Sequence, residues 1–177
     1  MVYTVTNTEI TGNVIKCKLH APNRTAANHF RRILMSEIPT FAIEMVEISS
    51  NTSNVYDEVL GHRLSLIPFC CDTDADECVL DVYAENQVRN VTAADLCVSE
   101  GIRPCQEDIL ICKLHPGQYI SLKAYLKEGT GKTHVKWSPV TVVTFTGKGP
   151  FDVYIETIGM VPGLTLLEKA LSILNEF

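Results

Sequence analysis

Two structural patterns meet in the stretch FDVYIETIGMVPGLTLLEKALSILNEF, residues 151–177. Residues 151–157 are predicted to form a strand, and Gly159, Pro162 and Gly163 mark a turn after it. Residues 164–177 have the period of a helix. At roughly 100° per residue, their apolar side chains fill an arc of roughly 180°. These side chains are Leu164, Leu166, Leu167, Ala170, Leu171, Ile173, Leu174 and Phe177.

The width of this apolar arc leaves two interpretations open. A helix that only covers one sheet needs an apolar stripe of about 100°. The wider arc is consistent with a helix that buries one side on its own sheet and the other on a partner protein. A helix deep in the core of a monomer would have the same pattern, because the arc indicates burial but not what covers it.

The start of the chain predicts a hairpin and another helix. Residues 3–20 are expected to form strands around a Gly12-Asn13 turn, with one apolar face. A helix is predicted over 25–38, with Asn23 or Thr25 as its N-cap and Pro39 ending it. Its apolar side carries Ala26, Ala27, Phe30, Ile33, Leu34 and Ile38.

The middle of the chain has a different character. A strand at 41–48 and a short helix at 55–69 lead into it. Strand-like segments then follow one another with turns between them, the clearest at Pro116-Gly117. These segments are 78–85, 108–114, 118–126 and 138–145. They predict a β-rich module over about 50–146.

Composition narrows the class of protein. The chain has 177 residues, 46% of them hydrophobic, and a net charge of −6, which argues against broad nucleic-acid binding. It has no run of eighteen apolar residues and begins without a secretory signal, so the nucleus or the cytoplasm is expected. The seven cysteines are therefore expected to be reduced.

The segment GTGKTHVKWSP, residues 129–139, resembles the end of a phosphate-binding loop. Such a loop needs an earlier glycine, where this chain has Leu126, and a helix after it. Pro139 and the β-branched run 140–144 predict a strand instead. We therefore expect a basic, glycine-rich loop between two strands, with no nucleotide or other cofactor bound.

The segment FCCDTDADEC, residues 69–78, carries possible metal ligands. Cys70, Cys71 and Cys78 lack the paired C-x₂₋₄-C spacing of zinc sites. The aspartates at 72, 74 and 76 lack the glycine and glutamate of an EF-hand loop. An acidic loop with free thiols is the expectation, with no metal bound. The five histidines are scattered and form no catalytic motif, so no catalytic residue is predicted.

Four blocks together resemble the alpha-type assembly subunit of DNA-directed RNA polymerase. The resemblance is strongest to the third-largest subunit of eukaryotic polymerase II and to its archaeal counterpart, and more distant to the bacterial alpha amino-terminal domain. The blocks are RRILMSEIPTFAIEMVEI (31–48), NTSNVYDEVLGHRLSLIP (51–68), DILICKLHPGQYISLKAYLKEGTGKTHVKWSPV (108–140) and residues 151–177.

This resemblance implies an α+β fold with two domains. One domain, about 1–49 plus 147–177, would be an antiparallel sheet with two helices packed on it. The other, about 50–146, would be an inserted β-rich domain. It implies a non-catalytic subunit that pairs with a small alpha-like subunit and holds the two large catalytic subunits and small accessory subunits, without contacting specific DNA sequences or a membrane.

The same resemblance assigns two sets of site residues. Arg31 and Arg32 match the paired arginines of the first helix, and the 129–139 loop matches an assembly contact. The docking residues would be Arg31, Arg32, Lys132, His134, Lys136 and Trp137. The predicted pairing surface consists of Ala27, Phe30, Leu34, Ile38, Leu167, Leu171 and Leu174.

The chain departs from this family in the cysteine segment. Eukaryotic relatives often carry a C-x-C-x₃-C-x₂-C zinc loop there, whereas CCDTDADEC breaks the spacing.

A self-associating binding module with the same fold outside a polymerase is the second functional hypothesis. An enzyme that uses the Gly129–Thr133 loop is the third.

Overall fold

The computed structural model describes residues 3–71 and 77–176, and divides the chain into two compact units. Unit 1 comprises Met1–Thr40 and Gly129–Phe177, and unit 2 comprises Phe41–Glu128. Unit 1 is therefore built from both ends of the chain.

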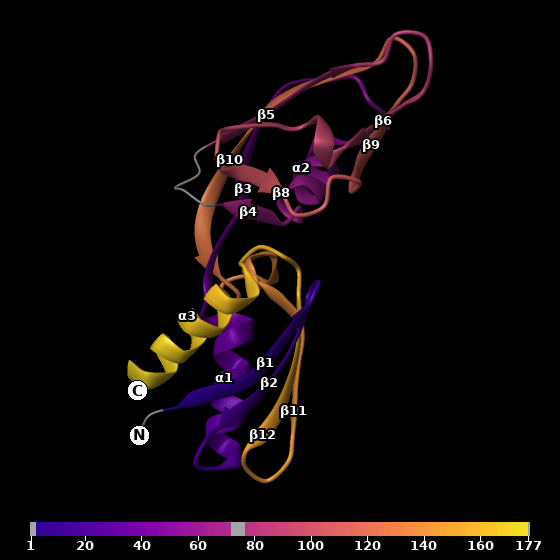
Figure 1. Ribbon diagram of the computed structural model, residues 1–177. Coiled ribbons are helices and arrows are strands. Elements are labelled where there is room, and N and C mark those ends of the chain that lie inside the picture. The colour runs from indigo at the N-terminus through magenta and orange to yellow at the C-terminus, as the bar shows by residue number, and fades with distance from the viewer. Residues whose placement is uncertain (1–2, 72–76, 177) are drawn as a thin grey trace. The chain divides into compact units, whose positions relative to one another are not determined.

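Unit 1 contains a four-stranded antiparallel sheet in the order β1-β2-β12-β11 (Figure 1). A turn at Gly12, with φ of +57°, joins β1 to β2. In β2 and β12 alternate side chains are buried, among them Ile15, Leu19 and Val153. The strands are β1 (Thr4–Thr11), β2 (Val14–His20), β11 (Val140–Thr146) and β12 (Phe151–Thr157).

Two helices, α1 (Arg24–Ser36) and α3 (Gly163–Glu176), contact each other in this unit, and α1 also contacts β11 (Figure 1). The side chain of Asn23 accepts a hydrogen bond from the Ala26 amide at 2.9 Å, which confirms it as the N-cap. Phe30 is fully buried, and burial of a side chain of this size stabilises a fold by about 1.5–3 kcal/mol.

Unit 2 contains a sheet in the order β3-β10-β5-β7, of which β3 and β10 run on into unit 1. Two smaller sheets pair β4 with β8 and β6 with β9. The elements are β3 (Pro39–Asn51), α2 (Asp57–Ser65), β4 (Phe69–Cys71), β5 (Glu77–Tyr83), β6 (Arg89–Thr92), the 3₁₀ turn η1 (Ala93–Asp95), β7 (Cys97–Val98), β8 (Ile102–Pro104), β9 (Leu110–Leu114) and β10 (Tyr119–Thr130).

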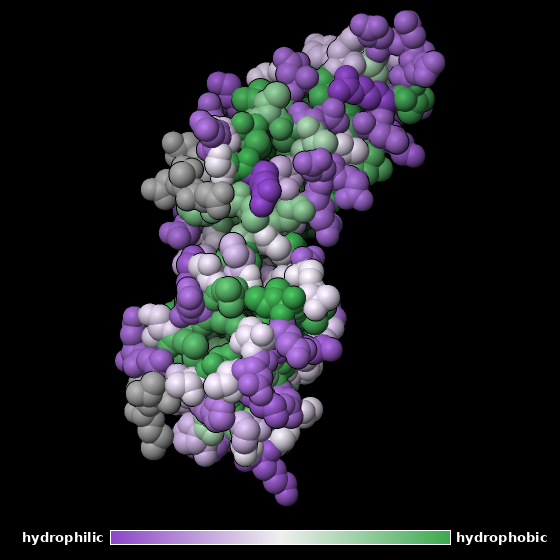
Figure 2. All heavy atoms as spheres, in the orientation of Figure 1, coloured by the Kyte–Doolittle hydropathy of each residue, from purple (hydrophilic) through white to green (hydrophobic). Residues whose placement is uncertain are grey.

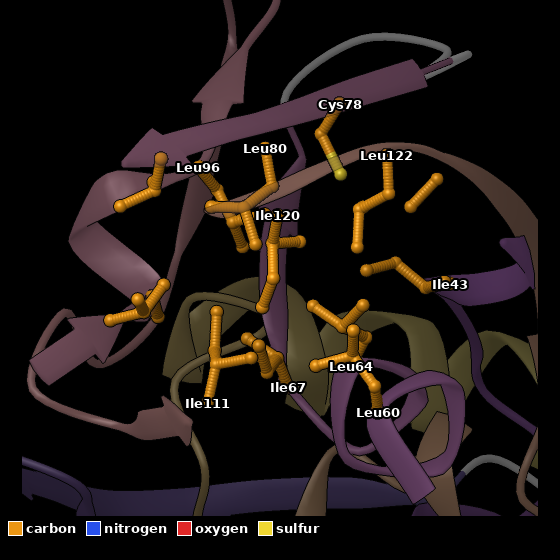
Figure 3. Close-up of a cluster of buried hydrophobic side chains, with 14 of the residues drawn as sticks. Ile43, Leu60, Leu64, Ile67, Cys78, Leu80, Leu96, Ile111, Ile120 and Leu122 are labelled. Carbon is orange, nitrogen blue, oxygen red and sulfur yellow. The ribbon is translucent and has the colours of Figure 1, made fainter. Parts of the chain in front are cut away.

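One apolar cluster forms the core of unit 2 (Figure 3). Leu60 and Leu64 enter it from α2, since they are one helical turn apart on the buried side of that helix. Leu80 on β5 and Leu122 on β10 are direct cross-strand partners in the same cluster. This shared core lies within Phe41–Glu128, the compact unit 2.

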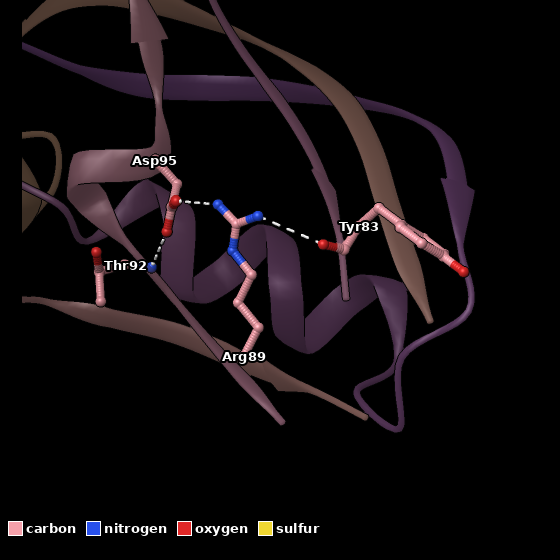
Figure 4. Close-up of polar contacts among 4 residues, drawn as sticks. All are labelled: Tyr83, Arg89, Thr92 and Asp95. Atoms are coloured by element: carbon pink, nitrogen blue, oxygen red, sulfur yellow. Dashed lines mark hydrogen bonds and ion pairs between the residues drawn. The ribbon is translucent and has the colours of Figure 1, made fainter. Parts of the chain in front are cut away.

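Arg89 holds the start of β6 to neighbouring elements (Figure 4). Its Nη2 lies 2.8 Å from Oδ1 of Asp95, and its Nη1 donates to the Tyr83 carbonyl at 3.3 Å. Asp95 also accepts from the Thr92 amide at 2.8 Å, which closes a capping box on η1. The ion pair is partly exposed, so it fixes geometry more than it adds stability.

Several elements differ from the sequence-based prediction. The first helix ends at Ser36 rather than residue 38, and Ile38 lies buried beyond it. The second spans Asp57–Ser65 rather than 55–69, because Phe69 begins β4. The predicted unit boundaries at 49/50 and 146/147 differ from the structural ones at 40/41 and 128/129. A short connection pairs β11 with β12 and so keeps 140–146 in unit 1.

None of the three helices described has the length and apolarity needed to cross a bilayer.

Candidate subunit-docking surfaces

The loop after β10 packs tightly because two of its residues are glycines. A Cβ atom at Gly129 would lie 2.5 Å from the Trp137 ring. A Cβ atom at Gly131 would collide with the carbonyl oxygen of Met35, near the end of α1. The glycines that resemble a phosphate loop therefore allow close approach of a ring and of a helix backbone.

Backbone hydrogen bonds fix this loop to α1 and to itself. The Lys132 amide donates to the Ser36 carbonyl at 3.0 Å, and the amides of Thr133 and His134 donate to the Thr130 carbonyl at 2.9 and 3.3 Å. A 3₁₀ turn, η2 (Val135–Trp137), follows. Nδ1 of His134 accepts from the Lys136 amide at 3.1 Å and so caps this turn.

Trp137 is the buried anchor of the loop, with 4% of its surface exposed. Its carbonyl accepts a hydrogen bond from the Thr40 hydroxyl at 2.7 Å. Nζ of Lys136 lies 4.3 Å from the Trp137 ring centre, a cation–π contact, and the His134 ring stands edge-on at 6.4 Å. The side chains of Lys136 and His134 are therefore arranged around one buried aromatic ring.

This geometry differs from that of a nucleotide site. The loop amides that would hold phosphates bond to carbonyl groups of the chain, and the element after the loop is a three-residue turn rather than a helix.

We predict that titration of Mg-ATP or Mg-GTP into the protein gives no saturable heat, because these amides are already paired. Lys132→Ala should give the same flat calorimetric trace. Micromolar binding by the wild type that disappears in Lys132→Ala would contradict this prediction.

The three arginines of α1 have different surroundings. Nε of Arg31 donates to the Val143 carbonyl on β11 at 3.0 Å, so this half-buried side chain braces the helix against the sheet. Arg24 lies over the Phe145 ring at 5.5 Å. Arg32 is exposed and lines a cavity of about 380 Å³ with His29 and Tyr3. Of the two predicted docking arginines, Arg32 has more surface to offer a partner.

Most side chains of the predicted pairing surface lie in the core of unit 1. Leu171 is half-buried and retains accessible surface. The other six have no more than 4% of their surface exposed, because α1, α3 and the sheet cover them: Ala27, Phe30, Leu34, Ile38, Leu167 and Leu174. In the chain alone these six side chains pack in the core of unit 1 and offer almost no accessible surface to a partner.

Other apolar side chains of α3 remain accessible. Leu164 is 60% exposed, and Leu171 and Ile173 are half-buried. Figure 2 shows apolar atoms gathered over the region of α3 in unit 1. The 180° arc therefore contains both the buried side chains and the accessible leucines. The helical wheel of 164–177 placed Leu164 in the apolar arc, but the predicted pairing surface did not include it. A wheel does not show which edge of the arc the rest of the chain covers.

The cysteines of the 69–78 segment lie on two strands. Cys70 and Cys71 are half-buried on β4, and Cys78 is buried on β5, where burial raises the pKa of its thiol to about 11. Residues 72–76, with the three aspartates considered for calcium, lie outside the described residues. Within 3–71 and 77–176, no group of three or more Cys, His, Asp or Glu side chains is arranged to hold a metal ion.

Two features of the 129–138 loop and its surroundings were not predicted from the sequence. Val135 is 70% exposed at the tip of η2, an apolar side chain between basic neighbours. Thr40 anchors the Trp137 carbonyl across a long sequence separation. The sequence around Thr40 has no signal that indicates this contact.

Comparison with known proteins identifies the family. Residues 38–144 match the model of the RNA polymerase Rpb3/RpoA insert domain. The chain is 35% identical to DNA-directed RNA polymerase subunit Rpo3 of Methanocaldococcus jannaschii, over 84% of this chain and 78% of that protein. The chain belongs to the family of RNA polymerase alpha-type subunits. The family resemblance proposed from the four sequence blocks is thereby confirmed.

Eukaryotic members of the family are similar over a smaller share of their length. The chain is 37% identical to DNA-directed RNA polymerase II subunit rpb3 of Dictyostelium discoideum, over 68% of this chain and 50% of that protein. It is 34% identical to DNA-directed RNA polymerases I and III subunit RPAC1 of Bos taurus, over 80% of this chain and 49% of that protein. This alpha-type chain thus spans about half the length of these eukaryotic relatives.

Proposed function

We propose that the chain is a non-catalytic assembly subunit of a DNA-directed RNA polymerase. In this role it pairs with a small alpha-like subunit through the α1–α3 side of unit 1, and the combined surface holds the two large catalytic subunits. The observation that carries the proposal is the α3 helix, which keeps accessible leucines beside a complete core in a chain of this family.

The accessible side chains of α3 support the choice of this face for pairing. Leu164 and Leu171 lie near one edge of the buried arc and Ile173 lies at the other, so the three flank the core residues of the helix. A partner helix laid along the edge with Leu164 and Leu171 would cover these two leucines and extend the core. Interface centres are apolar and depleted in charge, and the polar face with Glu168 and Lys169 would form the rim.

The loop at 129–138 is the proposed contact for the second-largest subunit and small accessory subunits. Lys132 and His134 are exposed, and Lys136 is half-buried over Trp137. Val135 gives this basic surface an apolar centre. A rigid loop loses little conformational freedom on docking, and its positive charge suits an acidic partner surface.

The test is affinity purification of a tagged chain from its native source, followed by mass spectrometry of the captured proteins. The proposal expects one small alpha-like protein and two very large polymerase chains in fixed stoichiometry. Recovery of the tagged chain with only copies of itself would contradict it and favour a self-associating binding module.

A further inference from the structure

Three cysteines meet where β4 and β8 pair in unit 2. Cys70 lies opposite Arg103 and Cys71 opposite Ile102 in the antiparallel ladder. The Cys105 amide donates to the Pro68 carbonyl at 2.9 Å, which continues this ladder by one residue beyond β8. Cys105 is therefore fixed beside the residue that precedes β4.

The pairing register places two of these thiols on the same side. Successive side chains of a strand alternate between faces, so Cys105 shares a face with Arg103, and Arg103 lies opposite Cys70. Cys70 and Cys105 are thus diagonal neighbours, which lie about 7–8 Å apart in a typical ladder, so a bond between them needs a small shift of the backbone at the end of β8. Their thiols form a hydrogen bond. Cys71 is on the other face of β4.

The surroundings of Cys105 disfavour its thiolate form. Both residues are half-buried, and all seven cysteines of the chain are reduced in the structure. Burial, with Cys70 next to it, raises the pKa of the Cys105 thiol to about 12. A disulfide becomes strongly oxidising when the corresponding dithiol is stabilised, as it is by a low thiol pKa. That stabilisation is missing at Cys105, so a disulfide here would be a weaker oxidant than one formed from low-pKa thiols.

We propose that Cys70 and Cys105 form a reversible disulfide that ties β4 to the end of β8. This inference does not depend on the proposed function.

Oxidised glutathione is a suitable oxidant for this reaction. The Cys70 thiolate attacks one glutathione sulfur and releases one glutathione thiolate. The Cys105 thiolate then attacks the Cys70 sulfur of the mixed disulfide and releases the second.

The reaction balances between the protein and glutathione. The two protein thiols lose two electrons and two protons, and one oxidised glutathione becomes two reduced glutathione molecules. The new bond closes the segment 71–104, which includes β5, β6 and β7, into a loop. Closing a loop restricts the unfolded chain, so oxidation should raise the urea concentration at which unit 2 unfolds.

The test treats the whole chain with oxidised glutathione, blocks remaining thiols with N-ethylmaleimide, and maps cross-linked peptides by mass spectrometry. We expect one dominant cross-link, Cys70 to Cys105, that dithiothreitol removes. Cys71→Ser should keep this cross-link, because Cys71 lies on the other face of β4. Cys105→Ser should lose it and accumulate a glutathione adduct on Cys70.

The wild-type result decides the proposal, so it stays testable even if a variant folds poorly. Wild-type protein that carries only glutathione adducts, or that joins Cys70 to Cys71 or Cys97, would overturn it. A Cys70–Cys105 cross-link that leaves the urea midpoint unchanged would overturn its stabilising effect on unit 2.

Discussion

Trp137→Ala is expected to lower the free energy of unfolding of unit 1 by about 3–5 kcal/mol, the range for removing a large buried aromatic ring. The ring is 4% exposed and fills the space over Gly129, with Lys136 stacked on it. No nearby side chain can collapse into the gap from Gly129, because glycine has none. Urea unfolding followed by far-ultraviolet circular dichroism measures the loss.

The matched control for this prediction is Val135→Ala, two residues away in the same turn. Val135 is 70% exposed, so its truncation should change the free energy of unfolding by no more than about 0.5 kcal/mol. A loss below about 1 kcal/mol for Trp137→Ala would mean that the ring does not anchor the loop, and the loop would then be a poor rigid docking surface.

Leu171→Glu is expected to abolish pairing with the small alpha-like subunit while the chain still folds. Leu171 is half-buried, so a carboxylate there reaches water in the chain alone. A partner that covers α3 would bury that charge without a counter-ion. An uncompensated buried charge costs about 3–5 kcal/mol, which is more than a hundredfold in affinity. Co-purification from cells that express both proteins should reveal this loss.

Ser172→Glu is the control, since it places the same charge one residue along on the exposed side of α3. It should leave the affinity within about twofold, since exposed substitutions away from a contact change free energies little. Equal losses in both variants would indicate a general effect of charge on the helix. Unchanged binding in Leu171→Glu would remove α3 from the proposed pairing surface.

Local patterns in the sequence were sufficient to predict most elements of unit 1. The Gly12 turn, the Asn23 cap and the strand 151–157 all follow from short-range chemistry, and each is found in the structure. The unit boundaries were harder to predict, because β11 looks the same whether it pairs with β10 or β12. Its assignment depends on long-range pairing with 151–157, which alternation along one strand does not indicate.

The candidate surfaces show a similar limit. A helical wheel indicates that Leu167 and Leu174 are buried, but the layer that buries them is α1 and the sheet, which lie far away in the sequence. The same is true of Arg31, whose bond to Val143 crosses from α1 to β11. The motif around Gly131 predicted a close approach to some group, and only the fold identifies that group as the Met35 carbonyl.

The central claim is that this chain assembles through the α1–α3 side of unit 1 with a small alpha-like subunit. Analytical ultracentrifugation of the chain, alone and co-expressed with that subunit from the same source, tests it most directly. The account predicts aggregation or self-association of the chain alone and a single one-to-one heterodimer after co-expression. A chain that sediments as a stable monomer and does not bind the partner would contradict the account.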